Sequence, residues 1–180
     1  MTSKLKTDVL ETVSGSGTIA LTNQLSGMTS ASVPALTSAH MPVGSVLQVL
    51  FNKYTTAWAT SSTGWVNTGL QITITPNSVN STVLVDWRQH VYFATSTSVW
   101  EGFRFRLLRD GVAIWTDNYG IAHAQYQGNT MDKRGDCFLD SPNTTSTVTY
   151  IVQLAPTSTE THTFNHGSAA SQIIATEIAG

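Results

Sequence analysis

The stretch Val99–Trp115, V-W-E-G-F-R-F-R-L-L-R-D-G-V-A-I-W, decides the fold of this chain. Its residues alternate, so one face of an extended strand carries Phe103, Phe105 and Leu107. Asp110 and Gly111 then predict a tight turn, because Asp tolerates a positive φ and Gly has no Cβ to clash. The apolar residues after the turn return as the partner strand. A hairpin this apolar is unstable alone in water, so the rest of the chain must cover it.

Similar alternation predicts further strands on both sides of this hairpin. The expected strands are 45–52, 70–75, 82–95, 135–140, 147–154 and 171–179. We expect 135–140 and 147–154 to pair with one another around the turn sequence that joins them. No stretch keeps a helical stripe of apolar residues for more than a turn or two. The pattern therefore predicts an all-β fold, an antiparallel β-sandwich of the jelly-roll type.

The chain divides by composition near residue 40. Residues 1–40 contain sparse apolar residues among Ser, Thr, Gly and Asn, too few to form a core. We expect this extended segment to order only against another chain, and residues 41–180 to form the sandwich. The final strand is apolar to its end, which predicts a central place in a sheet or a subunit contact. The expected contact residues of a homotrimer are Trp115, Ile173, Ile174 and Ile178.

Composition excludes several classes of function. Only 11% of residues are charged, against about 25% in ordinary domains. A net charge of −2 gives no electrostatic basis for binding nucleic acid. The sequence has no apolar run long enough to span a membrane and no secretory signal at residues 1–6. The one cysteine, Cys137, excludes an intrachain disulfide and is expected to be a small buried residue.

Few residues suggest catalysis or metal binding. His162 and His166 have a zinc-like spacing, but no cysteine pair accompanies them, so we interpret them as surface histidines. The aspartates at 132, 136 and 140 recur every four residues outside any helix and are interpreted as solvated. Arg134-Gly135-Asp136 matches an adhesion tripeptide that is too short to be informative. The sequence therefore predicts neither an enzyme nor a cofactor.

Aromatic residues in two long connections are the candidate binding residues. Exposed aromatic side chains on loops are what a carbohydrate- or protein-binding surface uses. The candidates are Trp58, Trp65, Tyr119, His123 and Tyr126. Because such loops hold almost no Lys or Arg, little dependence on salt is expected. The alternative is that the first connection folds back over an open end of the sandwich, since large aromatics are usually buried.

Three segments together resemble a known family. They are the opening Lys4–Val9 followed by S-G-S-G and I-A-L-T-N, the hairpin Leu107–Gly111, and Phe138–Ser146 leading into Tyr150–Gln153 and Thr176–Ala179. These segments resemble virion fibre and appendage proteins of tailed bacteriophages, particularly marine and cyanobacterial ones. The resemblance implies an N-terminal attachment segment and a C-terminal jelly-roll head, assembled as a trimer. The family has no shared catalytic motif to carry over.

The resemblance leads to a functional expectation with two alternatives. We expect a virion protein, assembled in the host cytoplasm, that adheres to a host cell-surface glycan or protein and joins other virion proteins through residues 1–40. The first alternative is a trimeric capsid decoration protein that stabilises the phage head. A polysaccharide-degrading tailspike is the second, and it is less favoured because no acidic pair or long β-helical repeat is visible.

Overall fold

The structure is a computed structural model that describes residues 40–117 and 124–180. Within these ranges, side chains are described except at 93–101 and 124–130. Its strands are β1 (Val46–Tyr54), β2 (Trp58–Thr60), β3 (Val66–Ile74), β4 (Thr82–Glu101), β5 (Phe103–Arg109), β6 (Val112–Thr116), β7 (Ala124–Asp140), β8 (Val148–Pro156), β9 (His162–Phe164) and β10 (Ser171–Ile178). A short 3₁₀ turn, η3 (His166–Ser168), precedes β10. The segment expected as an anchor, apart from His40, lies outside the described residues.

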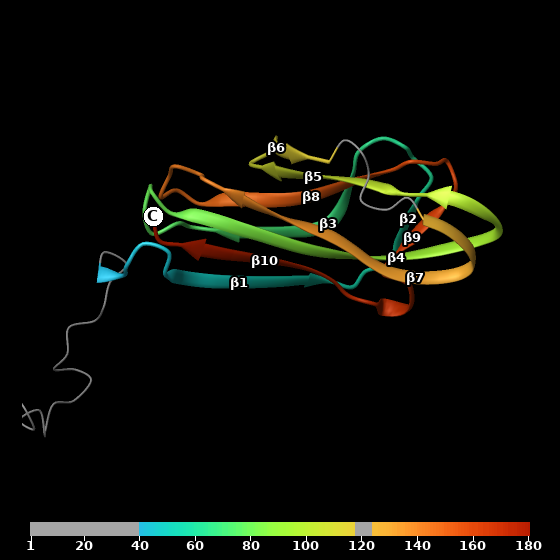
Figure 1. Ribbon diagram of the computed structural model, residues 1–180, viewed down its shortest axis with the longest axis horizontal. Helices are drawn as coiled ribbons and strands as arrows, with labels where there is room; N and C mark the ends of the chain where they lie inside the picture. The colour runs from blue at the N-terminus through green and yellow to red at the C-terminus, as the bar shows by residue number, and fades with distance from the viewer. Residues whose placement is uncertain (1–39, 118–123) are drawn as a thin grey trace, which may run out of the picture. The chain divides into compact units, whose positions relative to one another are not determined.

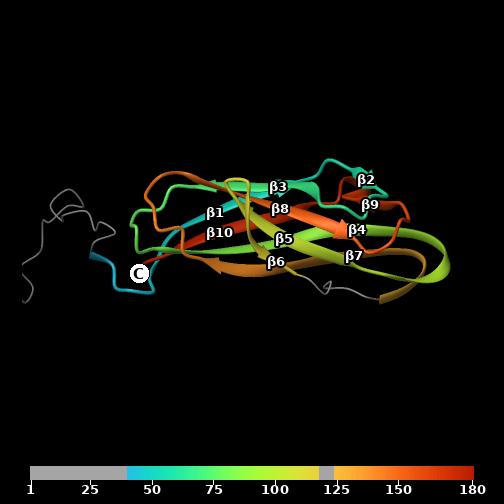
Figure 2. The same cartoon turned by 90° about the horizontal axis from the view of Figure 1, so that it is seen from above.

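The strands form two antiparallel sheets that face one another (Figure 1). One sheet has the order β1-β10-β4-β9-β2, with β7 on the other side of β4, and the second has the order β3-β8-β5-β6. Figure 2 shows the two layers from above. The order β1-β10-β4-β7 opposite β3-β8-β5-β6 is that of a jelly roll. The predicted fold class is therefore confirmed.

The strand pairs are nested around one turn. Asp110 and Gly111 have φ angles of 49° and 84°, as a type I′ turn requires. From this turn outward, β5 pairs with β6, β4 with β7, β3 with β8, β2 with β9 and β1 with β10. The domain is thus one long antiparallel hairpin, rolled up so that β10 also pairs with β4 and β8 with β5. The Asp-Gly turn predicted from the sequence is the tip of that hairpin.

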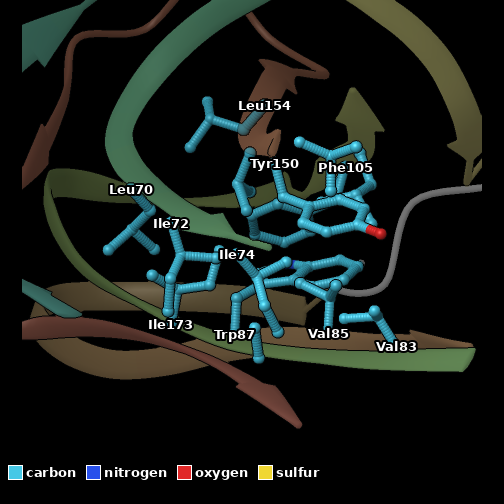
Figure 3. Packing of buried hydrophobic residues seen from close by; sticks show 14 of the residues in the cluster. Leu70, Ile72, Ile74, Val83, Val85, Trp87, Phe105, Tyr150, Leu154 and Ile173 are labelled. Carbon is cyan, nitrogen blue, oxygen red and sulfur yellow. The ribbon is translucent and has the colours of Figure 1, made fainter. Parts of the chain in front are cut away.

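The core lies between the two sheets. Trp87 is its largest fully buried side chain, and its ring meets those of Phe105 and Trp115 at centroid distances of 6.4 and 5.5 Å. Figure 3 shows Trp87, Val85 and Ile173 from one sheet packed against residues of the other. Aromatic pairs of this kind add about 0.5–1.5 kcal/mol each beyond the apolar area that they bury.

A buried polar contact joins the sheets next to this core. Arg109 of β5 donates two hydrogen bonds to the Asp140 carboxylate, at 2.9 and 2.8 Å. Tyr150 of β8 donates its hydroxyl to the same carboxylate at 2.7 Å. Burial and this hydrogen bond raise the pKa of Tyr150. Asp140 ends β7, so one carboxylate fixes the end of one sheet to two strands of the other.

Two expectations about β7 are wrong. Residues 135–140 and 147–154 do not pair with one another, because β7 pairs with β4 and β8 pairs with β3 and β5. The connection between them crosses from one sheet to the other, which lets both strands direct apolar residues into the same core. Cys137 is exposed rather than buried, because it lies on the outer face of its sheet. The central position of the last strand is confirmed, since β10 lies between β1 and β4.

The nested pairing predicts that the central turn forms early in folding. Gly111 and Gly167 both have a positive φ, and a Cβ added at either position meets no atom within 4 Å. Gly111→Ala and Gly167→Ala should therefore destabilise the domain by a similar amount, about 1 kcal/mol each. Only Gly111→Ala should also slow refolding, because only the turn at Gly111 must form before the outer strand pairs can. Stopped-flow refolding of both variants measures this difference, and equal refolding rates would contradict it.

Candidate functional site

The two tryptophans of the first long connection have different surroundings. Trp58 lies in β2 and stacks on Phe164 of β9, with ring centroids 4.2 Å apart and an angle of 19° between the planes. Phe164 is fully buried and also contacts Phe103. The Nε1 of Trp58 is buried as well. Trp58 therefore packs over the end of the sandwich, as in the alternative that folds the connection back over the core.

Trp65 lies instead on the outer face of the four-stranded sheet, just before β3. The guanidinium carbon of Arg106 is 4.7 Å from its ring centroid, and that of Arg104 is 5.5 Å away. Both distances are within the range of cation–π attraction. Phe103 and Phe105 alternate with these arginines along β5 and are fully buried, so the arginines must project outward. A regular strand thus holds both positive charges under one indole ring.

Two amide side chains extend this cluster across the sheet. The Nε of Arg106 donates a hydrogen bond of 2.6 Å to the Oε1 of Gln153 on β8. The Nε2 of Gln153 donates in turn to the Oδ1 of Asn67 on β3, at 2.7 Å. Three neighbouring strands therefore contribute to one polar and aromatic surface. We call it the tryptophan–arginine surface; it consists of Trp65, Asn67, Arg104, Arg106 and Gln153.

The other predicted binding residues cannot be added to this surface. Tyr119 and His123 lie outside the described residues. Tyr126 lies in β7, where its backbone pairs with that of Val99, and its side chain is not described. Trp65 was predicted from the sequence, whereas Arg104, Arg106 and Gln153 were not. The alternation of residues along β5 could have predicted the two arginines, because it places both of them on the outer face.

The candidate histidines and aspartates are separated by the fold. His162 is buried against Phe103, and burial lowers its pKa, so its interpretation as a surface histidine is wrong. His166 is exposed and stacks on Tyr92, with ring centroids 4.3 Å apart. Asp132 forms an ion pair with Arg134, whereas Asp140 is held by Arg109. In the described part of the chain, no group of three or more His, Cys, Asp or Glu residues could hold a metal ion.

A buried polar cluster beside β9 has a structural role. The hydroxyl of Ser171 donates to the Oδ1 of Asn165 at 2.5 Å and accepts the backbone N–H of His90 at 2.8 Å. Asn165 also donates to the backbone carbonyl of Thr56 at 3.1 Å. An amide oxygen is not a base that could activate the serine as a nucleophile. The cluster therefore fixes the course of the backbone where β9, β4 and the β1–β2 connection meet.

The outer face of the other sheet carries apolar residues from four strands, with Thr176 and Asp86 among them. Residues directly opposite one another in antiparallel strands share a face, and the register places Phe51 beside Ile174, and Leu84 beside Leu139. The exposed fractions of Val49, Phe51 and Leu139 are 59, 59 and 55%. We call this surface the apolar outer face; its residues are Val46, Val49, Phe51, Leu84, Leu139, Ile174 and Ile178.

The predicted subunit-contact residues divide between this face and the core. Ile174 and Ile178 are half-buried on the apolar outer face. Ile173 has no exposed surface and so cannot offer its side chain to another chain. Trp115 is half-buried and packs against Trp87 in the core. The reason is the period of the strand, which directs every second residue of β10 inward.

A buried carboxylate holds β10 at one end of the domain. Gln48 donates a hydrogen bond of 2.6 Å to Glu177, and Asn77 donates two, from its backbone at 2.6 Å and its side chain at 2.7 Å. Burial raises the pKa of Glu177, but these donors outweigh burial, and its pKa lies below the ordinary value. A cavity of about 280 Å³ adjoins this site. It is lined by Met41, Leu47, Asn77, Ser78, Ser81, Ala179 and Gly180.

Among the comparisons with known proteins, the one with solved structures gives matches. No model of a known protein family matches the chain, and no curated protein matches it. Among solved structures, the Gx strain of infectious bursal disease virus matches at 11% identity and a TM-score of 0.45, over 74% of this chain and 32% of that one. A VP2 subviral particle of the same virus matches at 10% identity and a TM-score of 0.46, over 74% and 33% of the two chains.

The overlap with these structures is partial. T=1 particles derived from infectious bursal virus match at 12% identity and a TM-score of 0.43, and 82% of this chain covers 36% of that one. The chain thus spans about a third of the length of the matched proteins. Likeness at this level leaves its function to be argued from its own residues. The described residues contain no helix that is long and apolar enough to cross a membrane.

The hydrogen bonds to Glu177 predict a dependence of stability on pH. Because its folded pKa lies below the unfolded value, Glu177 stabilises the fold above the unfolded pKa, and this contribution is lost as the pH falls through the folded pKa. Urea unfolding of the wild type and of Glu177→Gln from pH 7 to about pH 3 measures the effect. The wild type should be more stable at pH 7, and the difference should shrink in acid. A constant difference would contradict the assignment.

Proposed function

We propose that this chain is a structural protein of a virion, the head of a trimeric appendage of a tailed bacteriophage that adheres to the host surface. The observation that carries the proposal is the contrast between the outer faces of the two sheets. One presents the apolar residues of the apolar outer face, which suit contact with further copies of the chain, whereas the other carries the tryptophan–arginine surface. The family resemblance of the sequence supports the same assignment.

The apolar outer face supports self-association. Isolated exposed apolar residues are ordinary, but contiguous apolar patches mark interaction sites. Here neighbouring strands bring exposed residues of β1 and β7 together with half-buried residues of β10 and β4. In a homotrimer this face would be covered, and obligate interfaces exceed about 2,000 Å² in total. Residues 1–40 would then join the head to other virion proteins.

A role without catalysis is part of the proposal. The buried polar groups that could be mistaken for an active site have structural partners in the fold. Asp140 binds Arg109 and Tyr150, and Glu177 binds Gln48 and Asn77. Each carboxylate therefore accepts several hydrogen bonds from groups of the fold, and those to Glu177 lower its pKa. A general acid would instead need a carboxyl group with a raised pKa.

The alternative is a trimeric capsid decoration protein, which the apolar outer face would suit equally well. Immunogold electron microscopy of intact particles separates the two functions. An appendage head would be labelled at the tail or at one vertex, whereas a decoration protein would be labelled over the whole head. The purified protein should leave host polysaccharide uncleaved under either function, and cleavage would favour the tailspike class.

Self-association should depend on the apolar outer face. The double variant Val49→Gln/Phe51→Gln replaces two of its most exposed residues, and sedimentation of the wild type at micromolar concentration should show a trimer. The variant should dissociate at concentrations at least about tenfold higher than the wild type, because two large apolar side chains each contribute about 1.5–3 kcal/mol when buried. Val112→Gln is the control, since Val112 is 67% exposed on the other sheet. A monomeric wild type would contradict the proposed trimer.

Adhesion should depend on the presence of the protein on the particle. Phage particles that lack this protein should adsorb to host cells more slowly than complete particles, since they lack the receptor-binding head. The measurement is the rate at which free phage disappears from a suspension of host cells. Normal adsorption combined with heads that break more readily at low ionic strength would reject adhesion and favour the decoration function.

A further inference from the structure

We propose that the tryptophan–arginine surface binds an acidic saccharide, a sugar ring that carries a carboxylate or sulfate group. This inference deepens the proposed function, because it names the class of host-surface molecule to which the head would adhere. The site lies on the outer face of the four-stranded sheet, and Trp65, at the end of the first long connection, is the one member that was expected to bind. Its parts come from β3, β5 and β8, which pair with one another in that sheet.

The positive charge of this surface is available to a ligand. Arg88, Arg109 and Arg134 form ion pairs with aspartates, but among the side chains that the structure describes neither Arg104 nor Arg106 has a carboxylate partner. Arg104 donates a long hydrogen bond, 3.5 Å from its Nη2 to the backbone carbonyl of Thr63. Arg106 uses only its Nε, for Gln153. Both guanidinium groups therefore retain terminal N–H donors for an oxyanion.

The geometry favours a planar anion. A guanidinium group binds carboxylate or sulfate oxygens through parallel hydrogen bonds, and these charged bonds are about twice as strong as neutral ones. Arg104 and Arg106 are two residues apart on one strand, so both project from the same face. Trp65 packs against both of them. This contact restricts the side chains before a ligand arrives and so lowers the entropy lost on binding.

The neutral parts of the site suit a sugar. A sugar ring has one face of C–H bonds, which packs on an aromatic ring, and an edge of hydroxyl groups, which bind planar amides. Trp65 supplies the ring, and its half-buried indole keeps part of its surface open to solvent. Gln153 is fixed between Arg106 and Asn67. Asn67 therefore accepts from Gln153 with its oxygen and keeps its exposed amide N–H groups for a hydroxyl.

This site changes the salt dependence expected for adhesion. Loops with almost no Lys or Arg, the binding site expected from the sequence, would bind with little dependence on salt. Two unpaired arginines at a half-exposed site instead give an attraction that dissolved ions screen. Binding should therefore weaken clearly when NaCl rises from about 50 to about 300 mM, where the screening length falls below about 6 Å. Two arginines can neutralise only a few phosphates, so this surface does not suit a nucleic acid. The net charge of −2 also disfavours binding to nucleic acid.

The test uses the purified full-length chain and four polymers of known structure. Polygalacturonate supplies sugar with carboxylate, dextran sulfate supplies sugar with sulfate, dextran supplies neutral sugar, and polyglutamate supplies carboxylate without sugar. The wild type should bind one or both acidic polysaccharides more tightly than dextran or polyglutamate. The acidic polymer that binds identifies the anionic group. Arg106→Gln should weaken this binding about tenfold or more, because a charged hydrogen bond is lost.

The matched control is Arg88→Gln, which removes the same charge from the other sheet, where Arg88 pairs with Asp86 at 3.2 Å. It should bind as the wild type does. Trp65→Leu should weaken binding to the polysaccharides and leave the weak binding to polyglutamate unchanged. Melting temperatures are compared for all variants. If Arg106→Gln lowers the melting temperature, Arg104→Gln takes its place, since Arg104 makes the weaker hydrogen bond to the protein.

The possible results separate this inference from the proposed function. Equal binding to polyglutamate, or equal loss in Arg88→Gln, would show simple charge attraction and overturn the saccharide site. Failure to bind either acidic polysaccharide would overturn it as well. If polysaccharide binding depends on Trp65 and Arg106 but particles lacking the protein adsorb normally, the site stands and the adhesive function is rejected.

Discussion

The turn at Asp110 and Gly111 is the constraint on which the rest of the structure depends. Both residues hold positive φ angles, and every strand pair outside the turn repeats the same antiparallel relation at increasing distance along the chain. A shift of one residue at the tip would exchange the inner and outer faces of β5. Phe105 would then face solvent, and Arg106 would enter the core. The position of the tip thus decides which side chains the two sheets bury.

The position of the turn, which decides the inner and outer face of each strand, also explains why the two outer surfaces of the domain differ. The chain has few charged residues, and several of its charged contacts tie strands together, as at Asp140 and Glu177. The two arginines that alternate with the core residues of β5 lack such partners in the described part of the chain. The opposite sheet presents apolar residues outward from β1, β7 and β10. Two very different surfaces therefore follow from one strand period of two.

The sequence predicted the local structure well and the pairing of distant strands less well. The hairpin at Asp110 and the central place of β10 were both predicted, because alternation and turn chemistry are local signals. The pairing of 135–140 with 147–154 was wrong, because a short polar connection serves a hairpin and a crossing between sheets equally well. The prediction that Cys137 is buried was wrong for a related reason, since the period of a strand does not say which of its faces is buried. The tryptophan–arginine surface could not be predicted as a unit, because Trp65 and Gln153 meet only after β3, β5 and β8 have aligned.

The nested order of the strands also bears on how the protein is made. A ribosome releases β1 first, yet its partner β10 is synthesised last, so β1 remains unpaired until nearly the whole domain has emerged. During that time an apolar strand that includes Val49 and Phe51 has an open edge, which is the usual start of aggregation. At about 5–20 residues per second, this exposure lasts for several seconds or more. We therefore expect β1 to need protection, by a chaperone or by later parts of the same chain, until β10 has left the ribosome.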